Sequence, residues 1–319
     1  MTARTVPLPP AVPGELRTLD AVAGRLRYYV AQPPQESGAA GAAPLLLVHS
    51  INAAGTAYEV RPLYEHYRAT RTVYAPDLPG FGFSERSDRA YTPRLMTDAV
   101  LATVEEIRRI HGPAPIDALA LSLSCEFLAR AAVEAPGAFR SIALVSPTGF
   151  DRRAPHYGPP GSHRGMPLLR RFFTFPLWSR GFFDLLTTRS SIRFFLEKTW
   201  GSKAIDEGLL EYDCLTTRQP GARHAPYWFI SGFLFSNDVT RLYESLALPV
   251  WMAHGERGDF VDYRYKRAFA GRPNWTFNVF PAGALPHFEV LDAFTRAYDA
   301  FLARARANEP HMKEMSGAG

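Results

Sequence analysis

Short apolar runs along the chain alternate with longer segments whose apolar positions suit helices. The apolar runs lie at residues 44–48, 72–76, 116–121, 141–145, 249–253 and 275–280. Runs of this length and composition are typical of strands that are buried on both faces of a parallel sheet. Helices are predicted between or after them at residues 57–68, 93–110, 123–134, 263–270 and 286–306. This alternation predicts an α/β protein whose parallel strands are joined by right-handed crossovers.

The two ends of the chain depart from this pattern. Residues 1–14 are rich in proline and predict a loose arm, and residues 307–319 predict a flexible tail. Two strand-like runs, 15–20 and 25–31, follow the arm and are separated by a turn that contains glycine. We therefore expect the folded core to begin at residue 15 and to end near residue 306.

The alternation breaks off after residue 148 and resumes at residue 247. Between residues 151 and 203 there are ten Lys/Arg against three Asp/Glu, interleaved with many phenylalanines. No alternating strand pattern is present, so we expect several helices. Ligands of open α/β folds bind at the carboxyl edge of the sheet. We therefore predict a core of residues 15–148 and 247–306, with residues 149–246 inserted as a helical cap over that edge.

Composition, net charge and cysteine content reduce the number of functional classes that fit this chain. Hydrophobic residues at 46% and charged residues at 21% are usual for a soluble globular protein. The net charge of +5 is modest for 319 residues, and no nucleic-acid-binding motif accompanies it. Cys125 and Cys214 provide neither a disulfide framework nor a metal set, and Cys125 is expected to be a small buried residue. With no signal peptide or long apolar run, a cytoplasmic location is expected.

Ser122 stands where the run at 116–121 turns directly into a predicted helix. The residues two positions before and after it, Ala120 and Ser124, are small. A serine between two small residues at a sharp strand-to-helix turn is typical of a nucleophile elbow, which projects the hydroxyl above the sheet. The alternative is an ordinary junction at which Ser122 caps the helix.

Further motifs occur in order around this serine. They are VHSINAAG at 48–55, DLPGFGFS at 77–84, GERGDFVD at 255–262 and GALPHFE at 283–289. Together with Ser122 they resemble the α/β-hydrolase superfamily, in its serine-nucleophile branch with a helical cap, over residues 15–306. The resemblance implies a mostly parallel eight-stranded sheet with helices on both faces. The elbow serine argues against epoxide hydrolases and haloalkane dehalogenases, which use an aspartate there.

The resemblance also implies a mechanism. Ser122 would attack a carbonyl carbon, a histidine would take its proton, and an acid would orient that histidine. The amides of Ile51 and Leu123 would form the oxyanion hole, although Ser50 stands where the family usually has glycine. No cofactor or metal is implied, and no dinucleotide or metal motif is present.

Two further departures affect the acid and the base. The family's acid position is Gly258, so we assign the role to the next residue, Asp259, with Asp151 as the alternative. The family's histidine position is Ala284, and the nearest histidine, His287, lies three residues later. The departures fit either a shifted triad of Ser122, His287 and Asp259 or a chain that has lost hydrolysis.

The aromatic residues of the cap suggest the kind of substrate. Phe172, Phe173 and Trp178 are expected to line an apolar site for a small hydrophobic ester or related carbonyl compound. Packing of the cap onto the core and weak contact of a basic aromatic surface with membranes are alternatives for this segment. For the whole chain, the alternatives are a lyase- or oxygenase-like enzyme and a non-catalytic ligand-binding protein on the same fold.

Overall fold

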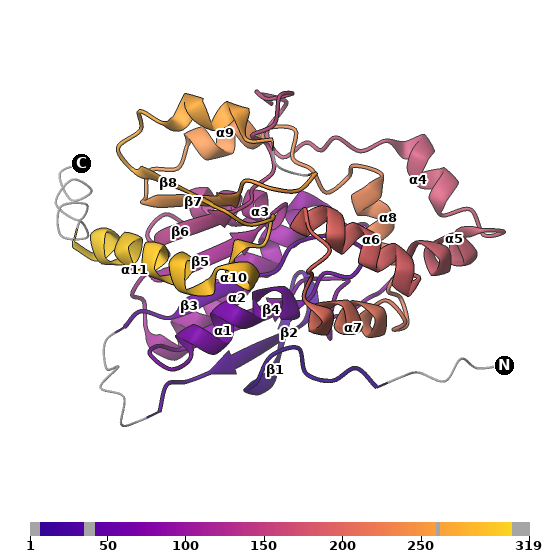
Figure 1. Cartoon of the computed structure of the whole chain (residues 1–319), viewed down its shortest axis with the longest axis horizontal. Coiled ribbons are helices and arrows are strands. Elements are labelled where there is room, and N and C mark those ends of the chain that lie inside the picture. The colour runs from indigo at the N-terminus through magenta and orange to yellow at the C-terminus, as the bar shows by residue number, and fades with distance from the viewer. Residues whose placement is uncertain (1–6, 35–41, 260–261, 308–319) are drawn as a thin grey trace.

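The computed structural model describes residues 7–34, 42–259 and 262–307, which form a sheet of eight strands between two layers of helices (Figure 1). The strands are β1 (Glu15–Ala21), β2 (Gly24–Ala31), β3 (Leu45–Val48), β4 (Val73–Asp77), β5 (Ile116–Leu121), β6 (Phe139–Val145), β7 (Val250–Gly255) and β8 (Trp275–Phe280). Their order is β1-β2-β4-β3-β5-β6-β7-β8. β2 is antiparallel to β1 and β4, and every later pair is parallel. The prediction of a mostly parallel eight-stranded sheet is confirmed.

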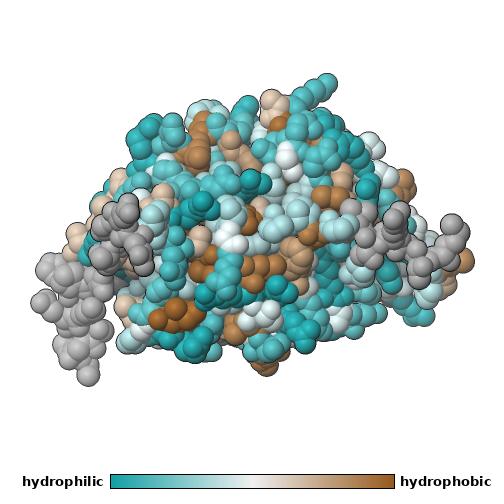
Figure 2. Space-filling model, turned by 90° about the horizontal axis from the view of Figure 1, so that it is seen from below, coloured by the Kyte–Doolittle hydropathy of each residue, from teal (hydrophilic) through white to brown (hydrophobic). Residues whose placement is uncertain are grey.

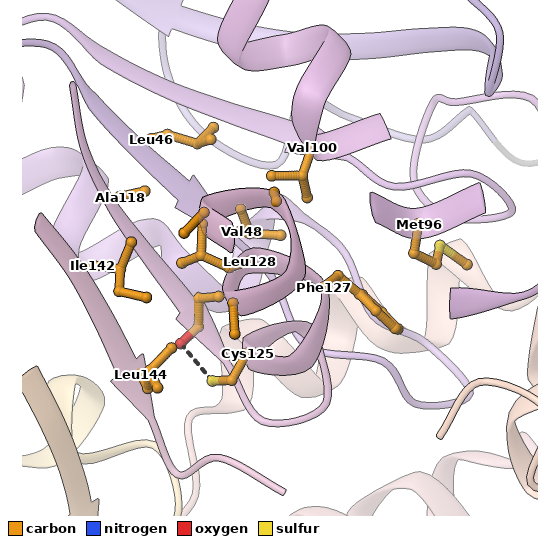
Figure 3. Packing of buried hydrophobic residues seen from close by; sticks show 14 of the residues in the cluster. Leu46, Val48, Met96, Val100, Ala118, Cys125, Phe127, Leu128, Ile142 and Leu144 are labelled. Atoms are coloured by element: carbon orange, nitrogen blue, oxygen red, sulfur yellow. Dashed lines mark hydrogen bonds between the residues drawn. The ribbon is translucent and has the colours of Figure 1, made fainter. Parts of the chain in front are cut away.

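Helices bury both faces of the sheet, because successive residues of each central strand point to opposite sides. On one face, Leu46, Val48, Ala118, Ala120, Ile142 and Leu144 pack against α2 (Pro93–His111) and α3 (Ser124–Glu134) (Figure 3). On the other, Leu45, Leu47, Leu119, Leu121, Ala143 and Val145 pack with residues of α1 (Arg61–Tyr67) and α11 (Leu291–Ala307). The two cores explain why these strands are apolar throughout.

Helix ends follow local sequence signals where these are strong. Thr92 is the N-cap of α2 and accepts a hydrogen bond from the amide of Leu95 at 3.2 Å, as its position before Pro93 predicts. The predicted helix at 57–68 is divided into a 3-10 turn, Ala57–Val60, followed by α1. The last helix is likewise divided, into α10 (Pro286–Glu289) and α11, so its first turn has its own direction.

The segment between β6 and β7, which we call the cap (residues 149–246), contains the helices that its composition predicts. They are α4 (Pro167–Phe173), α5 (Ser179–Leu186), α6 (Arg189–Trp200), α7 (Glu207–Thr216), α8 (His224–Ile230) and α9 (Val239–Glu244). Figure 1 shows α4 and α5 at the end of the molecule remote from α11. α9 packs on α3, and α7 lies against the turn that precedes α1. No helix in the described parts of the chain is both long and apolar enough to cross a bilayer.

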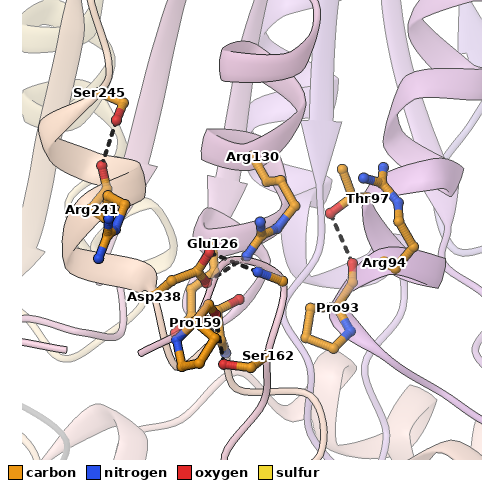
Figure 4. Close-up of polar contacts among 12 residues, drawn as sticks. Pro93, Arg94, Thr97, Glu126, Arg130, Pro159, Ser162, Asp238, Arg241 and Ser245 are labelled. Atoms are coloured by element: carbon orange, nitrogen blue, oxygen red, sulfur yellow. Dashed lines mark hydrogen bonds and ion pairs between the residues drawn. The ribbon is translucent and has the colours of Figure 1, made fainter. Parts of the chain in front are cut away.

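Buried charges on α3 fasten the cap to the core (Figure 4). Arg130 forms an ion pair of 2.7 Å with Asp238, and both side chains are almost completely buried. One turn earlier, the Glu126 carboxylate accepts hydrogen bonds from the Thr148 hydroxyl and from the Ser236 amide. Removing one partner of such a pair leaves a buried charge uncompensated, which typically costs about 3–5 kcal/mol. α3 therefore positions both the elbow and the inner end of the cap.

The expectation of a loose N-terminal arm is wrong for its described second half. Ala11 and Val12 are buried, and the amide of Ala11 donates to the Tyr29 hydroxyl at 3.0 Å. The carbonyl of Pro9 accepts a hydrogen bond of 2.8 Å from Tyr212 of α7. This stretch is apolar and reaches two tyrosine hydroxyls, so it packs onto the core. Residues 1–6 and 308–319, which include nearly all of the predicted tail, lie outside the described residues.

Candidate active site

Ser122 occupies the sharp turn that the sequence predicts. Its φ of 51° lies in the left-handed region, which costs a residue with a side chain roughly 1–3 kcal/mol. A hydrogen bond of 2.8 Å from its amide to the Val145 carbonyl ties the turn to the neighbouring strand. The residue that precedes α3 is Leu123, and no side chain caps this helix, so Ser122 is not a helix cap. The strained turn is the geometry of a nucleophile elbow.

Two backbone amides near the elbow are free to donate. Among the described residues, no hydrogen bond engages the amide of Ile51 or that of Leu123. Ser50 does not loosen the loop, because the Glu59 carboxylate accepts bonds from the Ser50 amide at 2.6 Å and from its hydroxyl at 3.0 Å. Asn52 also donates to this carboxylate, at 2.6 Å. Glu59, which the sequence analysis did not single out, thus holds the loop that carries Ile51.

Buried polar groups also fix the loop at 77–84. The Asp77 carboxylate accepts bonds from the amides of Ala57 and Phe83 at 3.0 and 2.8 Å. Gly82 has a φ of 50°, and a β-carbon there would lie 1.9 Å from the Asp77 carboxyl carbon. His49 accepts from the Leu78 amide and bonds the Ser50 carbonyl, so both of its ring nitrogens are used structurally. The glycine and aspartate of this motif therefore build the scaffold of the site.

His287 is buried and is not hydrogen-bonded to Ser122 or Asp259. Its Nε2 donates to the backbone carbonyl of Glu59 at 2.7 Å, and its Nδ1 has no partner. Burial lowers the pKa of His287 to about 4, so the ring is neutral at pH 7. The Glu59 carbonyl therefore selects the tautomer in which Nδ1 carries a free lone pair.

The predicted acid is engaged elsewhere. Asp259 is more than half exposed and forms an ion pair of 2.9 Å with Lys198 of the cap. The alternative, Asp151, pairs with Arg153 at 3.1 Å. Neither carboxylate contacts His287. Sequence order alone could not foresee this, because Lys198 is far from residue 259 in the chain and meets it only after the cap folds back.

The end of α6 occupies the space between the two loops that carry the family's acid and histidine positions. The Asp259 amide donates to the Lys198 carbonyl at 3.1 Å, and the Ala284 amide donates to the Thr199 carbonyl at 2.9 Å. Gly258 has a φ of 101°, and a β-carbon there would lie 2.8 Å from the Thr199 oxygen. A side chain at position 258 would therefore meet the cap backbone. The end of α6 thus contacts both positions at which the sequence departs from the family.

A second strained serine lies beside the elbow. Ser146 follows β6 with a φ of 50°, and its hydroxyl donates to the Ala284 carbonyl at 2.6 Å. Next to it, Tyr263 stacks on His254 with ring centroids 4.0 Å apart. Lys266 lies 2.8 Å from Nε2 of His254, and burial lowers the pKa of His254 to about 4. Among the described residues, Lys266 is the one charged group that bonds this ring, so His254 accepts a hydrogen bond from it.

The three cap aromatics do not share one environment. Phe172 is 53% exposed and contacts Trp178, which is 39% exposed, at a centroid distance of 5.4 Å. Phe173 instead packs on Phe182 and Tyr227 inside the cap. Phe172 and Trp178 therefore lie on the outer surface, contrary to the expectation that they line an internal site. A high number of aromatic residues predicts that much apolar surface is available for packing. It does not predict which side of a short helix faces the core.

Residues of α7 also face the core, beside the turn that precedes α1. Asp213 is buried, and one of its carboxylate oxygens has no partner. Burial, reinforced by the nearby Glu59 charge, raises the pKa of Asp213 well above its usual range. Arg86 joins the 77–84 loop to the same helix through the Gly82 carbonyl and the Thr216 hydroxyl, and burial lowers its pKa to about 10. Neither residue carries a sequence motif that could have revealed it.

The described side chains include no metal-ligand cluster. Within the described ranges, no three His, Cys, Asp or Glu side chains gather closely enough to hold an ion. Cys125 is buried as predicted, donates to the Ala120 carbonyl at 3.2 Å, and has its pKa raised by burial (Figure 3). A thiol in that state is a poor nucleophile. At the elbow, Ser122 is accompanied by two backbone amides that have no hydrogen-bond partner among the described residues.

Comparisons with known proteins agree with the fold. The serine hydrolase of carbazole degradation CarC is 15% identical at a TM-score of 0.68, over 91% of this chain and 98% of that one. A probable hydrolytic enzyme from Pseudomonas aeruginosa is 18% identical at 0.67, over 92% and 95%. The carboxylesterase CesB of Bacillus subtilis is 16% identical at 0.64, over 91% and 92%.

No curated protein matches the sequence. A family model described as "Alpha/beta hydrolase family" matches residues 45–304, which is most of the chain. The match includes Ser122, the loop that carries Ile51 and residues 149–246. The chain therefore belongs to the alpha/beta hydrolase family.

Proposed function

We propose that this protein is a cofactor-free hydrolase that cleaves a hydrophobic carboxylic ester or related carbonyl compound through an acyl-enzyme on Ser122. The observation that carries the proposal is the elbow, where a strained φ of 51° is retained beside the unengaged amides of Ile51 and Leu123. Backbone strain of this kind persists at sites that use it. Each such amide donor contributes roughly 3–4 kcal/mol to stabilisation of an oxyanion.

In the proposed step, the Ser122 oxygen bonds to the carbonyl carbon and its proton passes to Nδ1 of His287. That nitrogen is the ring's unpartnered acceptor, and a pKa of about 4 keeps it unprotonated at pH 7. The proton then goes to the departing alkoxide, and water releases the acid from the acyl-enzyme. Because no hydrogen bond joins Ser122 to His287, the step requires the segment at 283–289 to move when substrate enters.

The Glu59 carbonyl, rather than Asp259, would orient the base in this proposal. It holds Nε2–H at 2.7 Å and so keeps Nδ1 available. A neutral carbonyl stabilises an imidazolium less than a carboxylate does, since charge-assisted hydrogen bonds are about twice as strong. We therefore expect slow turnover and a preference for esters with good leaving groups.

A second candidate is a non-catalytic ligand-binding protein on the same fold. It is favoured by the contact between α6 and the two catalytic loops, which leaves Ala284 and Gly258 at the positions of the base and acid. This candidate predicts binding of an apolar carbonyl compound that Ser122→Ala does not change, with no turnover of any ester.

Labelling with a fluorophosphonate probe, followed by intact mass and peptide mapping, separates the two candidates. The hydrolase proposal expects one adduct on Ser122 that Ser122→Ala abolishes. Ser124→Ala is the matched control, since the Ser124 hydroxyl is buried, has no hydrogen-bond partner and lies two residues away. An unlabelled but folded protein that binds an ester analogue would refute the hydrolase and support the binding protein.

A further inference from the structure

Large exposed apolar side chains gather at one end of the cap. Of the thirteen such residues among the described residues, nine lie between residues 166 and 195. They are Met166, Leu168, Phe172, Phe175, Leu177, Trp178, Leu185, Phe194 and Phe195. Single exposed apolar residues are ordinary, but a concentrated set indicates a surface that binds something.

Most of these residues belong to α4, α5 and the turn between them. Leu168 is 82% exposed and Leu177 is 83% exposed. Next to Leu177 in the chain, Trp178 contacts the rings of both Phe172 and Phe175, at centroid distances of 5.4 and 4.5 Å. We call residues 166–180 with these side chains the α4–α5 face. The aromatic contacts hold it as one apolar surface rather than as separate side chains.

The α4–α5 face stands at one extremity of the molecule. Figure 1 places α4 and α5 at the end opposite α11, where they extend beyond the sheet. In Figure 2, which keeps the same horizontal axis, apolar patches reach the surface at that end among hydrophilic neighbours. A broad flat partner can therefore approach the α4–α5 face without meeting the core.

Arginines without acidic partners accompany the apolar side chains. Arg171 and Arg180 are exposed, and neither forms an ion pair with any described residue. Arg170 lies over the Trp228 ring at 3.8 Å. On the next helix the situation is different, because Arg193 of α6 pairs with Glu207 at 2.6 Å. The positive charge of the α4–α5 face is thus left available for an anionic partner.

We propose that the α4–α5 face binds the surface of an anionic lipid bilayer. Exposed leucine, phenylalanine and tryptophan beside free arginines are the chemistry of an interfacial anchor: the apolar side chains enter the headgroup boundary and the arginines contact lipid phosphates. α4 and α5 have seven and eight residues, so they lie in the interface and do not cross it. A second copy of the chain would bring Arg171 and Arg180 against like charges.

Vesicle co-sedimentation of the full chain tests the proposal. Binding is expected to vesicles of mixed phosphatidylcholine and phosphatidylglycerol, weaker binding to phosphatidylcholine alone, and loss of binding in high salt. Leu168→Ser/Leu177→Ser is expected to weaken binding at least about tenfold. Both side chains are largely in solvent, so the fold does not depend on them. Val22→Ser, at a residue that is 82% exposed in the turn between β1 and β2, is the matched control.

The contribution of the arginines to vesicle binding is tested separately. Arg171→Glu and Arg180→Glu are each expected to weaken binding about fivefold, and Arg304→Glu, at an exposed arginine of α11, is expected to leave it unchanged. Ser122→Ala is expected to bind anionic vesicles as the parent does. The vesicle assay therefore does not depend on whether the hydrolase proposal holds. The proposal is overturned by absence of binding to anionic vesicles, by an equal loss in Val22→Ser, or by a stable dimer that Leu168→Ser/Leu177→Ser dissolves.

Discussion

The two halves of the candidate site differ in what supports them. The half on β3 and β5 keeps the strained elbow, the Glu59-held loop and the Asp77 scaffold, all satisfied by buried hydrogen bonds. The half on β7 and β8 is filled by the end of α6, whose last carbonyls bind the amides of Asp259 and Ala284. The two halves of the candidate site therefore have separate structural supports, and one can change while the other is kept.

The strongest test of the first half is Gly82→Ala. The new β-carbon would overlap the Asp77 carboxyl group, at 1.9 Å, and the backbone has a φ of 50°. We expect unfolding by denaturant to show a loss of about 3 kcal/mol, because overpacking and strain add. Gly271→Ala, where nothing lies within 4 Å of the new carbon, is the control and should change stability little. Equal stability of the two variants would contradict the scaffold role of the 77–84 loop.

The second half is tested by Ala284→His, which places an imidazole at the family's histidine position. A general base contributes 10²–10⁴-fold when it is well placed, but no acid orients this one, so we expect fluorophosphonate labelling of Ser122 to become about tenfold faster. The backbone at this position is held against the end of α6, because the Ala284 amide donates to the Thr199 carbonyl. Unchanged labelling would mean that α6 keeps the imidazole away from Ser122.

These two halves also differ in how far the sequence predicted them. The sheet, the elbow at Ser122 and the Thr92 cap follow from local patterns, namely apolar runs, small residues around a serine and a threonine before proline. The position of Asp259 depends on Lys198, about sixty residues away in the chain. Glu59 and Asp213 carry no motif: Glu59 is identified by its bonds to Ser50 and Asn52 in the folded loop, and Asp213 by its burial near Glu59. Long-range packing decided the part of the site that the sequence did not predict.

A smaller effect, on the stability of the fold, is expected for Asp213→Asn. Asp213 belongs to α7 and lies near Glu59, between the two halves of the site. Burial holds the pKa of Asp213 above its unfolded value, so ionisation on raising the pH costs the folded state more than the unfolded one. The variant should therefore be more stable than the parent by about 1 kcal/mol near pH 8, with the difference shrinking towards pH 4. Thermal melts across this range measure it. Asp20→Asn, at an exposed carboxylate, is the control, and a difference that does not shrink at low pH would refute the account.

The smallest expected effect is that of pH on the reaction of Ser122. His287 is needed in its neutral form, and burial lowers its pKa to about 4, so it stays neutral between about pH 8 and pH 5.5. The rate of fluorophosphonate labelling should be nearly constant over that interval. For an imidazole with an ordinary pKa near 6.5, the neutral fraction would instead fall about tenfold over that interval. A profile that falls in this way would mean that the movement of the segment at 283–289 exposes His287 to water before Ser122 reacts, so that the ring no longer has its buried pKa.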